Sequence, residues 1–141
     1  MTLANPTRSF ALSAYNRDAV LLASPAQRLV MLYDRLLLDL ARARAAQESG
    51  DQIAASAQLV HAQEIVATLA ATLKDGLWEG SGALRSLYAY VLQRLVQANL
   101  EHSVAATEEC SALLAPIRDA WAQAAQQQQA PVSRLGDGID G

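Results

Sequence analysis

The sequence is poor in the residues on which catalysis, disulfide bonding and metal binding depend. It contains one cysteine, Cys110, and two histidines, so an intramolecular disulfide is excluded. The spacings Glu-x-x-His, His-Glu-x-x-His and Cys-x-x-Cys do not occur, and neither does a glycine-rich phosphate-binding loop. We therefore expect no catalytic residue, no cofactor and no metal site, and the protein is not expected to be an enzyme.

Basic charge and long apolar runs are also scarce. The 11 lysine and arginine residues are outnumbered by 14 aspartates and glutamates, which gives a formal charge of −3 and a pI near 5.2. Without a basic surface, nucleic acid is not an expected partner. No run approaches the roughly 18 apolar residues that span a bilayer, and residues 1–22 lack the pattern of a signal peptide. We expect a cytoplasmic protein without membrane insertion.

Glycine and proline fall almost entirely between segments with helical periodicity. Gly50 closes the first segment, a glycine cluster at 76–82 follows the second, and Asn99 is expected to end the third. Alternating β-branched residues are nearly absent, so strands are not expected. The prediction is all-α, an antiparallel up-and-down four-helix bundle with helices at about 25–48, 51–75, 83–98 and 102–126.

The segments outside the four helices complete the predicted organisation. Residues 1–12 are expected to be a flexible N-terminus, and residues 13–22 a short amphipathic helical segment. The bundle domain, with this segment included, spans 13–126. The glutamine-rich and glycine-rich residues 127–141 are expected to be a disordered tail.

The first helix has a clear start and more apolar residues than one buried face requires. Ser24, Pro25 and Gln27 form the pattern of a capping box with proline at the first helical position. At about 100° per residue, one face collects the predicted core residues Leu29, Leu32, Tyr33, Leu36, Leu37 and Leu40. Met31 and Leu38 fall on the opposite side and form a second, narrower apolar strip.

Each of the other three helices also has one predicted core face. In the second helix this face consists of Leu59, Ala62, Val66, Leu69, Ala70 and Leu73. In the third it consists of Leu84, Leu87, Tyr88, Val91, Leu92 and Leu95. In the fourth it consists of Ala106, Cys110, Leu113, Ile117 and Trp121.

Apolar residues outside these core faces predict a surface for a partner. Besides Met31 and Leu38, they are Ile53 and Val60 on the second helix and Tyr90 on the third. Together they suggest a groove able to take an amphipathic or extended segment of another protein. Two alternatives remain open, because a homodimer could cover the same surface, and so could the N-terminal residues Tyr15, Val20, Leu21 and Leu22.

Four ionisable residues and one proline interrupt the helical patterns. Asp34, Asp39, His61 and His102 are expected to be solvated side chains at the edges of the core faces. Pro116 lies inside the last helix, where it removes one backbone hydrogen bond. It should therefore kink that helix, at a cost of about 3 kcal/mol.

Several stretches, read in order, resemble the flagellin-export chaperone family, FliS. Tyr15, Val20, Ala-Ser-Pro at 23–25 and Leu-Val-Met-Leu-Tyr-Asp at 29–34 are similar to the opening signature of that family. The signature residues matched are Ser24, Pro25, Leu29, Leu32 and Tyr33. The similarity continues in HAQEIV at 61–66, LRSLYAYVLQRLVQAN at 84–99 and IRDAW at 117–121. Pro116 departs from the family pattern.

The resemblance implies a cytoplasmic helical bundle that binds newly made flagellin, prevents its premature polymerisation and presents it to the flagellar type III export gate. It also implies that the disordered C-terminal segment of flagellin wraps around the bundle. The N-terminal segment, matched here by Tyr15 and Val20, would cover part of that surface when no client is bound. The open alternative is a helical-bundle homodimer or adaptor without flagellin specificity.

Overall fold

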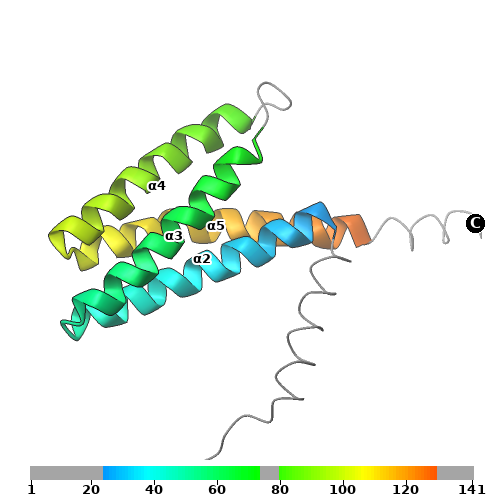
Figure 1. Cartoon of the computed structure of the whole chain (residues 1–141). Helices are drawn as coiled ribbons and strands as arrows, with labels where there is room; N and C mark the ends of the chain where they lie inside the picture. Colours follow the sequence, from blue (N-terminus) through cyan, green and yellow to red (C-terminus); the bar gives the residue numbers. More distant parts are fainter. Residues whose placement is uncertain (1–23, 74–79, 130–141) are drawn as a thin grey trace, which may run out of the picture.

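Four helices make up the fold in the computed structural model, which describes residues 24–73 and 80–129. They are α2 (Pro25–Glu48), α3 (Gln52–Ala71), α4 (Ser81–Glu101) and α5 (Val104–Gln129). Successive helices run in opposite directions, and the two ranges contain no strand (Figure 1). The predicted all-α, up-and-down four-helix bundle is confirmed. The segments predicted at 1–12 and 13–22, and the tail from residue 130, lie outside the described residues.

The start of α2 has the local structure that the sequence predicts. The Oγ atom of Ser24 accepts a hydrogen bond from the backbone N–H of Gln27 at 3.2 Å, and the Gln27 side chain accepts from the Ser24 N–H at 2.8 Å. Pro25 follows as the first helical residue. Such a cap is worth about 1 kcal/mol, because it satisfies backbone donors that have no partner within the helix.

The end of α4 differs from the prediction. Asn99 does not end the helix but lies inside it, and the helix continues to Glu101. His102 takes the left-handed conformation instead, with φ 53°, and Ser103 then caps α5 by accepting from the N–H of Ala106 at 3.0 Å. The bounds of α4 and α5 are therefore 81–101 and 104–129, rather than 83–98 and 102–126.

The buried side chain of Gln47 on α2 explains where this turn falls. Its amide nitrogen donates to the carbonyl oxygens of Ala98 and Ser103, at 3.4 and 3.3 Å, and its amide oxygen accepts from the Thr107 hydroxyl at 2.9 Å. A left-handed residue other than glycine costs about 1 kcal/mol. The contacts of Gln47, made from more than 50 residues away in the chain, fix the turn at His102 despite that cost.

The other helix bounds agree with the prediction at some ends and differ from it at others. The helix α2 ends at Glu48, as expected, and Gly50 follows with φ 79°. The helix α3 ends at Ala71 rather than near 75. The helix α5 continues through Pro116 to Gln129. Because Pro116 is exposed, the carbonyl group that loses its partner can be hydrated.

The core faces predicted from periodicity are the ones that pack together. Tyr33, Leu36 and Leu40 of α2 are fully buried, and the predicted residues of α3, α4 and α5 contribute to the same core. Ile65 and Leu114 are also buried, although the sequence analysis did not place them there. The helix α2 packs against α3 and α5, and α4 packs more extensively against α3 than against α5.

Candidate partner-binding surfaces

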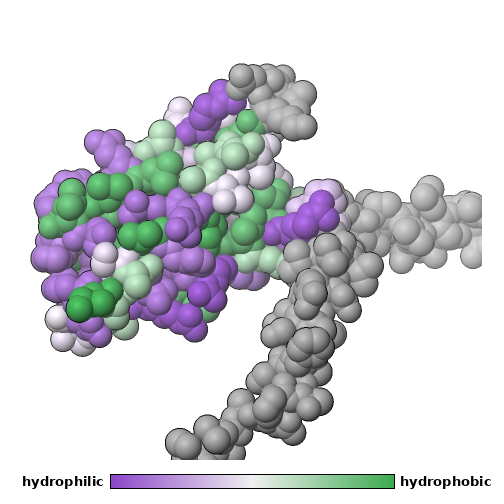
Figure 2. All heavy atoms as spheres, viewed as in Figure 1, coloured by the Kyte–Doolittle hydropathy of each residue, from purple (hydrophilic) through white to green (hydrophobic). Residues whose placement is uncertain are grey.

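Seven large apolar side chains are exposed in the part of the chain that the structure describes. They are Met31, Leu38, Ile53, Val60, Tyr90, Val96 and Leu100. The first five were predicted from the sequence to lie off the core faces, whereas the last two are additional. Single exposed apolar residues are normal in soluble proteins, so the informative feature is where they gather. Figure 2 shows hydrophobic residues running over α4 and recurring along α3 on the face in view.

Met31 and Leu38 form a narrow strip on the side of α2 that faces away from the core. Their exposed fractions are 38% and 41%, whereas Leu36 between them is fully buried. Seven residues correspond to about two helical turns, so the two side chains lie one above the other. Beside this strip, Nε of Arg118 donates to a carboxylate oxygen of Asp34 at 2.7 Å. The strip is therefore apolar but bordered by charge.

Asp39, which was expected to be solvated, is completely buried. Its carboxylate accepts a hydrogen bond from Nε of Arg35 at 3.0 Å and pairs with Nδ1 of His61 on α3. A buried carboxylate requires such partners, because its desolvation is otherwise too costly. The prediction of a solvated side chain is thus wrong for Asp39, and His61 is its half-buried partner. This cluster of Arg35, Asp39 and His61 separates the strip on α2 from α3.

The helices α3 and α4 share an apolar face near the two short turns of the bundle. Nδ2 of Asn99 donates to Oγ of Ser56 at 3.2 Å across the contact between these helices. The exposed apolar side chains within about one turn of this bond are Ile53, Val60, Val96 and Leu100, which together we call the α3–α4 face. Ile53 and Leu100, exposed by 87% and 76%, are the most exposed of the seven.

The sequence analysis did not identify the half of the α3–α4 face that lies on α4. Val96 and Leu100 are four residues apart and so lie on one side of a helix. The third helix was predicted to end at residue 98, which left Leu100 outside it. Val96 was inside the predicted helix but was assigned to no surface. The i, i+4 spacing was the available signal, but it needed the correct helix end to be recognised.

Tyr90 lies on the other side of α4, toward α5. Its hydroxyl donates to Oε2 of Glu109 at 2.8 Å, and Nε of Arg94 donates to Oε1 of the same carboxylate at 2.6 Å. The hydrogen bond to Glu109 raises the pKa of Tyr90, and the bonds from Tyr90 and Arg94 lower the pKa of Glu109. The structure therefore does not bring Tyr90 together with the α3–α4 face or with the strip on α2, and the predicted groove is divided into three surfaces.

Two apolar clefts open at the opposite end of the bundle, where α2 and α4 begin. One has a volume of about 320 Å³ and an almost wholly apolar lining of Gly80, Leu84, Ile117, Ala120, Trp121 and Ala124. The other has a volume of about 400 Å³ and is lined by Pro25, Arg28, Leu29, Leu32, Thr72, Leu73, Tyr88 and Trp121. Three signature residues, Pro25, Leu29 and Leu32, thus line a cleft. We refer to these two as the end clefts.

The floor of the end clefts is held by buried aromatic side chains. The hydroxyl groups of Tyr33 and Tyr88 are hydrogen-bonded to each other, and both rings are almost completely buried. Burial raises the pKa of Tyr33, while hydrogen bonds with Tyr88 and Trp121 oppose that change. Burial, followed by the bond to Tyr33, also raises the pKa of Tyr88. The signature residue Tyr33 therefore builds the support beneath the clefts rather than their surface.

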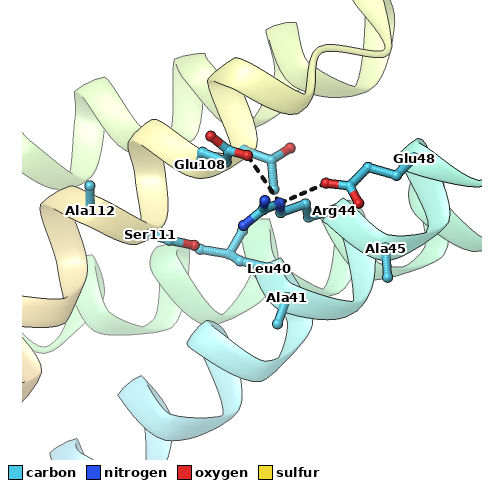
Figure 3. A pocket seen from close by; sticks show the side chains of 9 residues that line it. Leu40, Ala41, Arg44, Ala45, Glu48, Glu108, Ser111 and Ala112 are labelled. Carbon is cyan, nitrogen blue, oxygen red and sulfur yellow. Dashed lines mark hydrogen bonds and ion pairs between the residues drawn. The ribbon is translucent and has the colours of Figure 1, made fainter.

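A third groove, between α2 and α5, contains charged side chains. It has a volume of about 610 Å³, and Arg44 lies across it (Figure 3). Nε of Arg44 is 2.8 Å from a carboxylate oxygen of Glu48 and 3.0 Å from one of Glu108. Because the guanidinium group occupies the space with its own ion partners, this groove does not offer an apolar binding surface.

The described residues contain no cluster of metal-ligating side chains, and their cysteine is buried. Within residues 24–73 and 80–129, no group of three or more histidine, cysteine, aspartate or glutamate side chains could hold a metal ion. Cys110 is fully buried, and burial raises the pKa of its thiol to about 11, so the reactive thiolate form is disfavoured. None of the helices in these ranges is long and apolar enough to cross a bilayer.

Open apolar clefts and exposed apolar strips on a helical bundle are the features of a module that binds other proteins. Sequence comparison then identifies the family. The family model for flagellar protein FliS matches residues 8–128, and the chain belongs to this family of flagellar secretion chaperones. It is a chaperone and not an enzyme.

Three relatives support this assignment over most of the chain. The flagellar secretion chaperone FliS of Bacillus subtilis is 32% identical over 117 residues, covering 83% of this chain and 87% of the relative. The proteins of the same name from Salmonella typhimurium and Escherichia coli are 40% and 37% identical, covering 75% and 74% of this chain and 80% and 78% of the relatives.

A solved structure supports the fold. The crystal structure of a flagellar chaperone from bacteria superimposes with a TM-score of 0.68 at 13% identity, covering 83% of this chain and 98% of the other.

Proposed function

We propose that this chaperone acts in the cytoplasm on flagellin, binds its disordered C-terminal segment, prevents premature polymerisation and delivers it to the flagellar type III export gate. Membership of the FliS family supports the general role in flagellar export. The observation that carries the more specific proposal is the pair of end clefts. Both are apolar and open, and the signature residues Pro25, Leu29 and Leu32 line one of them.

The shape of the surface suits a partner that is disordered before it binds. Ordering such a segment costs about 1–2 kcal/mol per residue, so the surface that receives it has to be long and apolar rather than a single pocket. The end clefts share Trp121 in their linings and so lie next to each other. Beyond them, we assign further contacts with the segment to the predicted residues Met31, Leu38, Ile53, Val60 and Tyr90.

The N-terminal segment is the proposed cover of this surface when no client is bound. The predicted residues of the cover, Tyr15, Val20, Leu21 and Leu22, lie outside the described part of the chain. The segment leads directly into Ser24 and Pro25, and Pro25 lines an end cleft. A cover attached at that point would compete with a client by occupying the same apolar wall, and the apparent affinity would fall by the fraction of molecules that are covered.

Calorimetric titration with a peptide from the C-terminal segment of flagellin tests the proposal. We expect heat of binding and a rise in the melting temperature. Ala120→Asp places a carboxylate in an end cleft and should weaken binding about tenfold or more, because the charge would be desolvated against an apolar wall. The matched control, Gln123→Asp, alters an exposed residue of the same helix outside the cleft and should bind normally. Absence of both heat and a melting shift with the unaltered protein would refute the proposal.

A further inference from the structure

Among the described residues that line the end clefts, Arg28 is the only one that carries a charge. It belongs to the lining of the larger cleft, of about 400 Å³, together with Leu29, Leu32 and Trp121. The described lining of the smaller cleft contains apolar residues and a glycine. One positive charge therefore distinguishes the larger end cleft from the smaller one.

Local hydrogen bonds fix the point on α2 from which the Arg28 side chain extends. The backbone N–H of Arg28 donates to the carbonyl oxygen of Ser24 at 2.9 Å, next to the capping box formed by Ser24 and Gln27. The first turn of α2 contains no acidic residue, although a helix dipole favours acidic rather than basic side chains at this end. The helix dipole therefore does not account for a basic residue at position 28.

The other arginines of the bundle indicate which group is complementary to a guanidinium in this protein. Four of them contact carboxylates of the bundle itself: Arg35, Arg44, Arg94 and Arg118. None of these four lines an end cleft. A guanidinium group presents N–H donors in a planar arrangement that matches the two oxygens of a carboxylate. A carboxylate is therefore the complementary group for Arg28 as well.

We propose that Arg28 binds an aspartate or glutamate side chain of the client segment and thereby sets the register of that segment across the end clefts. The inference rests on the proposed function, since it places the client in these clefts, and it adds the charge that the client has to supply. An apolar client side chain would lie against Leu29 and Leu32, and an acidic residue near it in the client would reach Arg28. Apolar contacts alone are non-directional, whereas a charge pair fixes the register.

Covering the larger cleft changes the surroundings of Arg28 in a way that discriminates between clients. The Arg28 side chain is exposed in the free bundle, so a client that covers the cleft takes the place of part of its water. A carboxylate replaces that water with a charge-assisted hydrogen bond, and an amide replaces it with a weaker one. A lysine repels the guanidinium group. Affinity should therefore decrease from an acidic residue to an amide and then to lysine.

Three synthetic peptides of about 14 residues, or four helical turns, test this order. They share one leucine face and an amidated C-terminus, and they carry glutamate, glutamine or lysine at the positions beside that face. Titration of the full-length chaperone, followed by peptide fluorescence anisotropy, should show the glutamate peptide binding about fivefold more tightly than the glutamine peptide. This preference should shrink as salt is raised. Equal affinities, a preference for the lysine peptide, or no binding of any peptide would overturn the inference.

Variants of the protein assign the preference to one residue. Arg28→Gln should remove the preference for glutamate over glutamine and keep the native helix content, because the two residues have similar helix propensities. The matched control Arg42→Gln removes the same charge from an exposed site of α2 outside the end clefts and should keep the full preference. Arg28→Glu should reverse the order, so that the lysine peptide binds most tightly. Equal effects of glutamine at 28 and 42, or an unchanged order in Arg28→Glu, would refute the assignment.

Calorimetry with the flagellin peptide distinguishes a failure of this inference from a failure of the proposed function. If the flagellin peptide binds the unaltered protein and Arg28→Gln with equal affinity, and the synthetic peptides are not discriminated, the proposed function stands and this inference fails. If the glutamate peptide is selected through Arg28 but the flagellin peptide gives no heat, the cleft selects carboxylates of another client and the proposed function fails. Weaker binding of flagellin peptide by Arg28→Gln, but not by Arg42→Gln, would support both.

Discussion

Replacing Leu38 by aspartate should leave the bundle folded, whereas the same change at Leu36 should unfold it. Leu38 is 41% exposed, so about 59% of its surface is covered, and covering a whole leucine side chain contributes about 2.5 kcal/mol. The loss is therefore about 1.5 kcal/mol, and the poorer helix propensity of aspartate adds about 0.5 kcal/mol. At the fully buried Leu36, an unpaired carboxylate adds several kcal/mol, which approaches the whole stability of a typical domain.

Circular dichroism, thermal melting and calorimetry with the flagellin peptide measure both consequences. Leu38→Asp and its strip neighbour Met31→Asp should keep native helix content, melt several degrees lower and bind the peptide about tenfold more weakly. Leu36→Asp serves as the control for a core position. If both strip variants unfold, the strip is part of the core and the reasoning from exposure is wrong. If both fold and bind normally, the strip is not a client contact.

Two further predictions concern buried polar and ionisable groups. Asp39→Asn keeps the shape of the side chain but removes the charge that Arg35 and His61 contact. We expect the free energy of unfolding, measured in urea, to fall by about 1–3 kcal/mol. An unchanged urea midpoint would show that the cluster of Arg35, Asp39 and His61 does not contribute to stability. The Cys110 thiol, with its pKa raised from 9.0 to about 11, should resist Ellman's reagent at pH 8 in the native state and react at once in denaturant. Because the folded pKa is the higher one, its contribution to stability is complete below about pH 9 and is lost as the pH rises toward 11, which pH-dependent urea melts would detect.

The fold was predictable because helical periodicity and local capping signals agree with it. The residues spaced to share one face of each helix are the ones found in the core, and Ser24 and Gln27 cap α2 as their types and spacing indicate. What could not be predicted depends on residues far apart in the chain. The pairing of Asp39 with His61 and the turn fixed by Gln47 at His102 both require the helices to be assembled first.

The sequence predicted which residues of the candidate surfaces are exposed, but it did not predict how these residues are arranged relative to one another. A helical projection shows that Met31, Ile53 and Tyr90 leave the core face, and all three are exposed. The projection does not show which neighbouring helix each side of a helix approaches. The sequence analysis therefore placed residues of separate surfaces in one groove. The end clefts depend on how α4 is inclined to α5, a relation set by packing between helices rather than by the pattern within any one of them.

The position of the short turns gives the molecule two chemically different poles. Both turns lie at one pole (Figure 1), next to the α3–α4 face. The residues that line the end clefts lie toward the other pole. Under the proposed function, a client segment that fills the end clefts and also contacts Ile53 and Val60 would have to run the length of the bundle. A single short helix could cover one pole but not both, so covering the whole apolar surface would require an extended segment.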